Sequence, residues 1–197
     1  MRIRVTGLVL SLALLVIVLV GSCANVMPVN TNVDSTLSTT NKSSVPGSDY
    51  VLLFRYGAGW TTNGETISGR YNQLDTLHGT YTKDMIATPS TTVSLILPAS
   101  DMAAIYAKMQ EIDFFAYPSD FSVKPPPGSN TTMVTPSQLY YLEVNEGSMA
   151  KTLLWNDNIL NPDTQATKLR DLIQLIKSII ESKAEYKALP PASGGYL

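Results

Sequence analysis

Short apolar runs that alternate with polar residues begin at about residue 49 and divide the chain into two regions. In the second region these runs are rich in β-branched and aromatic residues and are separated by glycine, asparagine and proline, a pattern typical of strands joined by turns. Four strands are expected in its first part: Asp49–Tyr56, Thr66–Leu74, Leu77–Ile86 and Thr91–Leu97. Gly79 lies inside the third strand, where a glycine indicates a bulge.

Two helices are expected where apolar residues recur three and four positions apart. The first is capped by Ser100 or Asp101 and ends near Phe114–Phe115. Its apolar face consists of Met102, Ile105, Tyr106, Met109 and Ile112. Asn161 is expected to cap the second helix, with Pro162 at the first helical position, where a missing N–H is harmless. Its apolar stripe consists of Leu169, Leu172, Ile173, Ile176, Ile179 and Ile180.

A hairpin is expected between the two helices. Its strands are Gln138–Val144 and Ala150–Trp155, and the loop Asn145–Met149 contains a glycine. The order of strands, helix, hairpin and helix favours an antiparallel sheet with two helices packed on one face, an α+β two-layer sandwich. Residues 49–190 are expected to form this single domain, and residues 191–197 a mobile tail.

The first 22 residues have the layout of an export signal peptide. Arg2 and Arg4 precede an apolar run, Leu8–Val20, and small residues follow it. The ending Val20-Gly21-Ser22-Cys23 resembles the lipobox of bacterial lipoproteins. This resemblance implies that the Cys23 thiol receives a diacylglyceryl group and that cleavage after Ser22 makes Cys23 the acylated first residue.

The alternative, an uncleaved membrane anchor, needs about 20 apolar residues, and the uncharged run is shorter. Two or three acyl chains hold a protein firmly on a membrane. We therefore expect a lipid-anchored protein on the extracytoplasmic face of the cell membrane. Position 24 is Ala rather than Asp, so the family's inner-membrane retention signal is missing, and an outer-membrane location is open if the host has one.

Residues 23–48 are expected to be a disordered tether between the anchor and the domain. Thirteen of the 25 residues from Ala24 to Ser48 are Ser, Thr or Asn, and no apolar period is present. The alternative is a loosely ordered strand that packs on the domain. As a coil, the tether has an end-to-end distance of roughly 25–30 Å, enough to hold the domain clear of the lipid headgroups.

Composition and charge exclude several classes of protein. The net charge is −2, which lacks the basic excess of a nucleic-acid-binding protein. One Cys and one His exclude an intramolecular disulfide framework and a structural zinc site. No cofactor and no nucleic-acid partner is expected.

Four local patterns carry weak chemical signals. Ser148 and Lys151 match the S-x-x-K pattern of penicillin-binding proteins, but they lie in the expected hairpin and the companion motifs are absent. His78 has no nucleophile in its sequence context. Gly57-Ala58-Gly59 lacks the third glycine of a phosphate-binding loop. The oxygen-bearing residues of 156–163 fit no EF-hand spacing. We therefore assign no catalytic, cofactor-binding or metal-binding residue. Cys23 is assigned as the lipidation site.

The segment Pro118–Ser137 is expected to have no element of its own and contains Pro125-Pro126-Pro127. A connection of this length inside a domain is uncommon and is usually functional or disordered. Prolines stiffen it, which lowers the entropy lost when a partner binds. Two interpretations stay open, a contact surface and a variable surface loop.

Two stretches, Gly79–Ile86 and Ile112–Pro118, resemble a domain of uncharacterised lipoproteins from Gram-positive bacteria. The resemblance covers roughly residues 50–187 and implies no assigned activity. The layout is also similar to that of emfourin-type inhibitors of thermolysin-like proteases: Arg55–Gly59, a helix that ends in Phe-Phe, a Tyr-rich hairpin and a Leu/Ile-rich helix. That similarity is topological and assigns no residue.

Taken together, these patterns predict a non-catalytic interaction module, not an enzyme. Its expected partners are membrane lipid, through acylated Cys23, and an envelope or secreted protein. One alternative is a protease inhibitor that uses Pro118–Ser137 or Gly57–Gly64 as its inhibitory loop. A second is an envelope hydrolase whose carboxylates come from distant strands.

Overall fold

The computed structural model describes residues 46–47, 49–58, 61–62, 65–66 and 71–195. All of the described residues belong to one compact unit, Asn41–Leu197. The expected signal peptide, Cys23 and nearly all of the expected tether lie outside the described residues.

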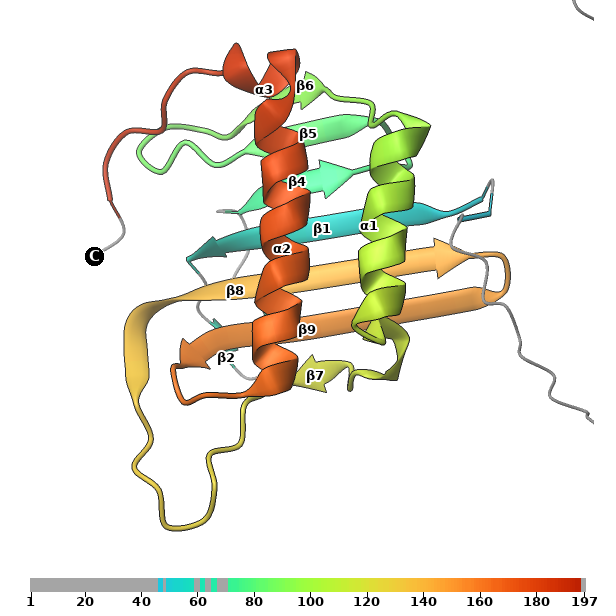
Figure 1. Cartoon of the computed structure of the whole chain (residues 1–197). Helices are drawn as coiled ribbons and strands as arrows, with labels where there is room; N and C mark the ends of the chain where they lie inside the picture. The colour runs from blue at the N-terminus through green and yellow to red at the C-terminus, as the bar shows by residue number, and fades with distance from the viewer. Residues whose placement is uncertain (1–45, 48, 59–60, 63–64, 67–70, 196–197) are drawn as a thin grey trace, which may run out of the picture. The chain divides into compact units, whose positions relative to one another are not determined.

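A seven-stranded sheet forms one layer of this unit, in the order β6-β5-β4-β1-β8-β9-β7 (Figure 1). Its strands are β1 (Val51–Ala58), β4 (Asn72–Asp75), β5 (Thr80–Lys83), β6 (Thr91–Ser94), β7 (Asp120–Phe121), β8 (Met133–Glu146) and β9 (Met149–Ile159). Neighbouring strands pair antiparallel, except that β7 pairs parallel to β9. A separate ribbon, β2 (Thr61–Thr62) and β3 (Glu65–Thr66), belongs to the connection between β1 and β4.

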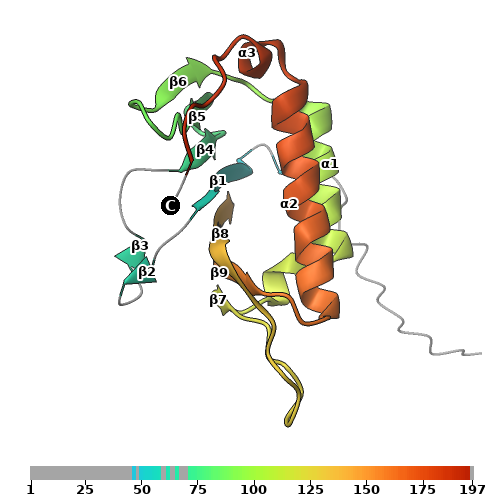
Figure 2. The same ribbon diagram turned by 90° about the vertical axis from the view of Figure 1, so that its left-hand side faces the viewer.

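Two helices, α1 (Ala99–Glu111) and α2 (Thr164–Ser182), lie side by side across one face of the sheet. Figure 2 shows both helices on the same side of the strands. The short helices η1 (Phe114–Ala116) and α3 (Ala184–Lys187) follow them. This arrangement confirms the expected α+β class, with a mostly antiparallel sheet and two helices on one face.

The hydrophobic core lies between these helices and the sheet. Along β1, Leu52, Phe54 and Tyr56 are buried and the residues between them are half-buried, as expected when one face of a strand meets the core. The buried residues of α1 and α2 include most of the two expected apolar faces: Ile105, Tyr106, Met109, Leu169, Leu172, Ile173, Ile176 and Ile180. Trp155 and Tyr81 are the largest fully buried side chains among the described residues.

The start of α1 differs from the prediction. The helix begins at Ala99 after Pro98, and no side chain caps it, so the expected caps Ser100 and Asp101 are wrong. Asp101 lies in the first turn, where its charge favours the helix dipole. It also forms an ion pair with Lys183, which follows α2. Asp101 thus connects the two helices.

The start of α2 also differs by two residues. Its N-cap is Asp163, whose Oδ1 accepts a hydrogen bond from the N–H of Ala166 at 2.7 Å. The expected cap Asn161 is therefore wrong, although Asn and Asp are equally good caps in general. Asn161 uses both atoms of its side-chain amide for the loop before β8 instead.

Several strands have other bounds than predicted. β4 and β5 are four residues each, and a turn at residues 76–79 separates them. Gly79 lies in this turn with a φ of +62°, so it is not a bulge. Thr66 belongs to β3 rather than to the strand that contains Leu74. The apolar run that continues to Leu97 leaves the sheet after Ser94, at the end of β6.

The segment Pro118–Ser137 contains more regular structure than predicted. It includes β7 and the first five residues of β8, residues 133–137. β8 and β9 have 14 and 11 residues, longer than the expected strands, and only Gly147 and Ser148 connect them. Gly147 has a φ of +59°, a conformation that glycine adopts without steric cost. The irregular part of the segment is thus residues 118–119 and 122–132.

The C-terminal segment is tied to the connection that follows β5. Ser193 forms an isolated bridge with Ile86, and the N–H of Ala87 donates to the Ser193 carbonyl at 3.1 Å. Lys83 Nζ donates to the carbonyl of Pro190 at 2.9 Å. The expected tail, residues 191–197, therefore contains at least one residue that contacts the domain.

Candidate functional site

The chain enters the domain at one end of the sheet, beside the turn between β8 and β9. The N–H of Gly47 donates to Glu146 Oε1 at 2.7 Å, and Asp49 Oδ2 accepts from the N–H of Gly147 at 2.6 Å. Tyr106 on α1 donates to the other Glu146 oxygen at 2.8 Å. These hydrogen bonds fasten the last residues of the expected tether to the domain.

The loop of residues 122–132 lies at the opposite end of the sheet (Figure 1). It connects to the first residue of β8, whereas the entry point lies beside the last. Because β8 has 14 residues and a strand rises about 3.3 Å per residue, the path along the strand between the two ends is about 40 Å, although β8 bends near its start (Figure 1). We call the loop together with Met133 and Leu160 the loop pole.

Hydrogen bonds hold the base of this loop. Asn161 Oδ1 accepts from the N–H of Thr132 at 2.8 Å, and its Nδ2 donates to the carbonyl of Asn130 at 2.9 Å. The N–H and Oγ of Ser129 both donate to the carbonyl of Pro126, which closes a turn. Val123 is buried at the other base of the loop. The loop is therefore anchored on both sides while its tip is exposed.

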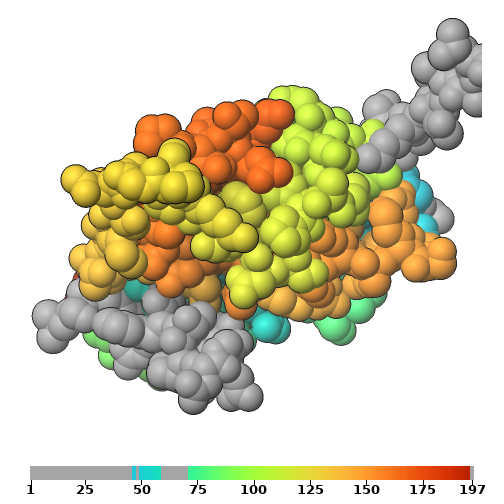
Figure 3. All heavy atoms as spheres, turned by 90° about the horizontal axis from the view of Figure 1, so that it is seen from below, coloured from blue at the N-terminus to red at the C-terminus, as the bar shows by residue number. Residues whose placement is uncertain are grey.

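The surface of the loop pole is nearly uncharged and combines exposed apolar side chains with Ser, Asn and Thr. Met133 is 61% exposed and Leu160 is 53% exposed. Lys124 is the one charged residue in the sequence from 122 to 137. Figure 3 shows the loop (yellow) as a projecting ridge beside the start of α2 (orange). This combination of stiff prolines and exposed apolar side chains suits contact with another protein.

The face of the sheet opposite the helices carries polar and aromatic side chains. Arg55 of β1 lies between its two cross-strand partners, Gln73 of β4 and Tyr141 of β8. Its Nε donates to Gln73 Oε1 at 2.7 Å, and its guanidinium lies 5.1 Å from the ring centre of Tyr71 and 5.7 Å from that of Tyr141. No local pattern in the sequence predicts this cluster, although Arg55 is the one charged residue in an otherwise apolar strand.

Glu143 lies on the same face but bonds to its own strand. Its Oε2 accepts from the Tyr141 hydroxyl at 2.9 Å, and its Oε1 accepts from Asn145 Nδ2 at 3.3 Å. Burial and the hydrogen bond to this carboxylate raise the pKa of Tyr141, and the charge of Arg55 opposes that rise. The phenol therefore stays neutral and donates to Glu143 near neutral pH.

His78 lies in the turn between β4 and β5 and pairs with Asp75. Its Nδ1 is 2.8 Å from Asp75 Oδ2, and its N–H donates to Asp75 Oδ1 at 3.0 Å. Burial acts to raise the pKa of Asp75, but the hydrogen bonds from His78 outweigh it, and the pKa lies below its usual range. The arrangement closes a turn, and no described nucleophile bonds to the His78 ring.

Two buried tyrosines form a hydrogen-bonded pair on the core side of the sheet. The hydroxyls of Tyr56 and Tyr81 are 2.8 Å apart, and Tyr81 donates to Asn72 Oδ1 at 3.2 Å. Lys177 Nζ lies 5.1 Å from the ring centre of Tyr56. Burial raises the pKa of Tyr56 to about 12, despite the opposing hydrogen bond with Tyr81. Burial also raises the pKa of Tyr81, with a contribution from Tyr56.

The residues of the S-x-x-K pattern do not form a pair. Ser148 lies in the turn between β8 and β9, and Lys151 lies in β9. Lys151 Nζ donates to the carbonyl of Tyr117, so its ammonium is used in a structural contact. Gly57 and Ala58 are part of β1, and Gly59 lies outside the described residues.

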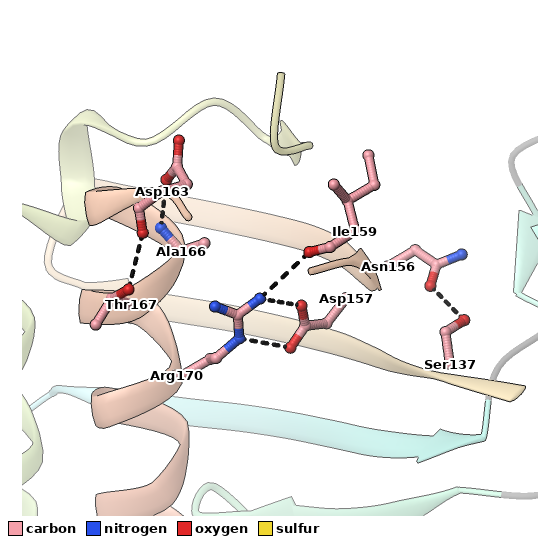
Figure 4. A network of polar contacts seen from close by, with 8 residues as sticks. All are labelled: Ser137, Asn156, Asp157, Ile159, Asp163, Ala166, Thr167 and Arg170. Carbon is pink, nitrogen blue, oxygen red and sulfur yellow. Dashed lines mark hydrogen bonds and ion pairs between the residues drawn. The ribbon is translucent and has the colours of Figure 1, made fainter. Parts of the chain in front are cut away.

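The oxygen-bearing side chains of residues 156–163 are dispersed over separate contacts (Figure 4). Asn156 accepts from Ser137 Oγ at 2.7 Å, and Asp163 caps α2. Both oxygens of Asp157 accept from Arg170, at 2.6 and 2.9 Å. Asn161 holds the loop pole, so these groups do not converge on one point.

The lipidation site Cys23 lies outside the described residues, so its modification stays a prediction. Within the part of the chain that the structure describes, no helix is long and apolar enough to cross a membrane. Nor does any group of three or more His, Cys, Asp or Glu among those residues have the arrangement to hold a metal ion. In comparisons with known proteins, no family model matches the chain and no curated protein matches it.

Proposed function

We propose that this chain is a bacterial lipoprotein, anchored through acylated Cys23 on the extracytoplasmic face of a membrane, and that its domain is a non-catalytic binding module. The anchor is supported by the sequence Val20–Cys23 and the apolar run before it. The resemblance to uncharacterised lipoproteins agrees with this assignment but adds no activity.

The position of the loop pole carries the proposal for binding. The chain that leads back to Cys23 enters the domain beside Glu146, and the loop pole lies about 40 Å away along the 14 residues of β8. The loop pole therefore lies at the end of β8 away from the point where the chain enters, so a partner can reach it without displacing residues 46–47 and 49. The partner we propose is an envelope or secreted protein.

The chemistry of the loop pole supports the same kind of partner. Prolines and the hydrogen bonds of Asn161 restrict the loop before binding, which reduces the entropy lost in a complex. The exposed side chains of Met133 and Leu160 offer apolar area that a protein partner removes from water.

The anchor is tested by mass spectrometry of the protein extracted from membranes of its source bacterium. The expected N-terminus is a cleaved, acylated Cys23. An intact Met1 with an unmodified Cys23 thiol would contradict the lipoprotein assignment.

The binding surface is tested by capture from the native envelope with matched variants of the full chain. The test variant is Met133→Ser with Leu160→Ser. The control is Leu77→Ser with Ile96→Ser, whose side chains are 68% and 76% exposed at other positions. Wild type and control are expected to capture the same envelope protein, and the test variant at least tenfold less. Equal capture by all three proteins would rule out the loop pole.

Protease inhibition is the second candidate function. It is favoured by the loop of residues 122–132, which is exposed at its tip and anchored at its base, as a loop that occupies a protease cleft has to be. We expect the protein to reduce the activity of a secreted metalloprotease when it is added in molar excess. Unchanged proteolysis across a panel of such enzymes rejects this alternative.

A further inference from the structure

We propose that the sheet face opposite the helices carries an oxyanion-binding site centred on Arg55, which binds the carboxylate or phosphate group of an acidic saccharide. This inference goes beyond the proposed function, because that function uses the loop pole and not this face. Its parts are Arg55, Gln73, Tyr71 and Tyr141.

The guanidinium of Arg55 is held in a defined orientation. Gln73 accepts from Nε at 2.7 Å, and the rings of Tyr71 and Tyr141 lie 5.1 and 5.7 Å from the guanidinium carbon. The Nε contact occupies one edge of the planar group. The two terminal nitrogens form the remaining fork, which matches the two oxygens of a carboxylate or phosphate.

The charge of Arg55 has no carboxylate partner among the described residues. Of the ion pairs that join those residues, none includes Arg55. Glu143 lies on the same face, but it accepts hydrogen bonds from Tyr141 and Asn145 and forms no ion pair with Arg55. A half-buried guanidinium that forms no ion pair with any described residue favours an anion as its ligand.

Arg170 is an arginine whose hydrogen bonds all go to other groups of this domain, and it offers a comparison with Arg55. Its guanidinium also lies over an aromatic ring, that of Trp155, at 5.3 Å. In contrast to Arg55, it donates two hydrogen bonds to Asp157, at 2.6 and 2.9 Å. Arg55 has the aromatic contacts of Arg170 without its carboxylate, and an external oxyanion completes the same arrangement.

The row of side chains that contains Arg55 favours a saccharide as the carrier of the anion. On five neighbouring strands the register aligns Thr92, Thr82, Gln73, Arg55 and Tyr141. With about 4.8 Å between strands, this row spans about 19 Å. Its hydroxyl and amide groups both donate and accept hydrogen bonds, as sugar hydroxyls do.

An acidic peptide fits this face less well. Peptides commonly bind by adding a strand to a sheet edge. β1, β4 and β5 are interior strands with a hydrogen-bonded neighbour on each side, so their backbones offer no free edge. A ligand on this face therefore depends on side-chain contacts.

The test uses the full chain in detergent at low ionic strength, with ligand-observed NMR as the binding assay. The probes are glucuronate, glucose 6-phosphate, glucose and the dipeptide Glu-Glu. We expect at least one of the two acidic sugars to bind and glucose not to bind, and added salt to weaken binding. Comparison of the two acidic sugars identifies the preferred group. Binding of neither acidic sugar, equal binding of glucose, or preference for Glu-Glu would overturn the proposal.

Variants separate the site from general charge. Arg55→Gln is expected to weaken binding of the acidic sugar at least about tenfold, and Arg55→Lys by a smaller factor, because lysine keeps the charge and loses the fork. Lys168→Gln removes one positive charge from the exposed surface of α2 and is expected to bind like wild type. Circular dichroism checks that each variant is folded. Wild-type affinity in Arg55→Lys, or in a folded Arg55→Gln, contradicts the assignment.

Discussion

The N-cap of α2 allows a prediction that separates the contribution of a hydrogen bond from the contribution of a charge. Asp163 Oδ1 accepts the N–H of Ala166 at 2.7 Å, and Ala166 is fully buried. Replacement of Asp163 by Ala leaves that N–H without its acceptor at a place that water does not reach easily. It also removes a negative charge from the positive end of the helix dipole.

The expected loss follows from these two contributions. Loss of a side-chain cap costs typically about 1 kcal/mol, and an acidic residue in the first turn contributes about 0.3–1 kcal/mol. Because Ala166 is buried, the free energy of unfolding should fall by about 2 kcal/mol in Asp163→Ala. Asp163→Asn keeps the acceptor and loses only the charge, so its expected loss is about 0.5 kcal/mol.

The assay is urea unfolding of the compact unit Asn41–Leu197, followed by circular dichroism. For a domain of this size, a loss of about 2 kcal/mol lowers the Tm by roughly 4–8 °C. The reasoning is refuted if Asp163→Ala unfolds within about 0.5 kcal/mol of wild type. It is also refuted if Asp163→Asn loses as much stability as Asp163→Ala, because the hydrogen bond would then contribute nothing.

Three further predictions concern the loop pole and the titratable groups. Asn161→Ala removes the hydrogen bonds that hold the loop of residues 122–132, so limited proteolysis should cut this loop faster while the urea midpoint changes little; an unchanged cleavage rate would contradict this role. Burial raises the pKa of Tyr56 to about 12, so the folded state keeps a proton that the unfolded chain releases near pH 10. The free energy of unfolding should therefore fall as the pH rises above 10. A urea midpoint that is equal at pH 9 and pH 11 would contradict this prediction. His78→Ala should raise the pKa of Asp75 toward its ordinary value, measured by NMR titration of the carboxyl carbon. The stability contributed by this pair is present above the unfolded pKa and is lost as the pH falls through the lowered folded pKa, and an Asp75 pKa that is unchanged in the variant disproves the contribution of His78.

The sequence predicts one of the two candidate surfaces and not the other. The proline-rich segment was visible because its composition differs from that of the strands around it. The Arg55 cluster was not visible, because it depends on which residue of β8 lies opposite Arg55. A shift of one residue in that pairing would place Tyr141 on the other face of the sheet. The acylation of Cys23 stays a prediction from its sequence context.

The sequence by itself determined the elements whose periodic pattern is local. The alternation in β1 and the apolar stripe of α2 each specify one buried face. Two helices with one apolar face each, beside strands linked as hairpins, pack most simply as one layer of helices on one layer of sheet. The tertiary structure decided between options that are locally equal. Asn161 and Asp163 are both good caps, and only the loop that Asn161 holds makes Asp163 the cap. β7 is two residues long and exists because β9 offers it a partner, an interaction between distant parts of the chain that no local pattern records.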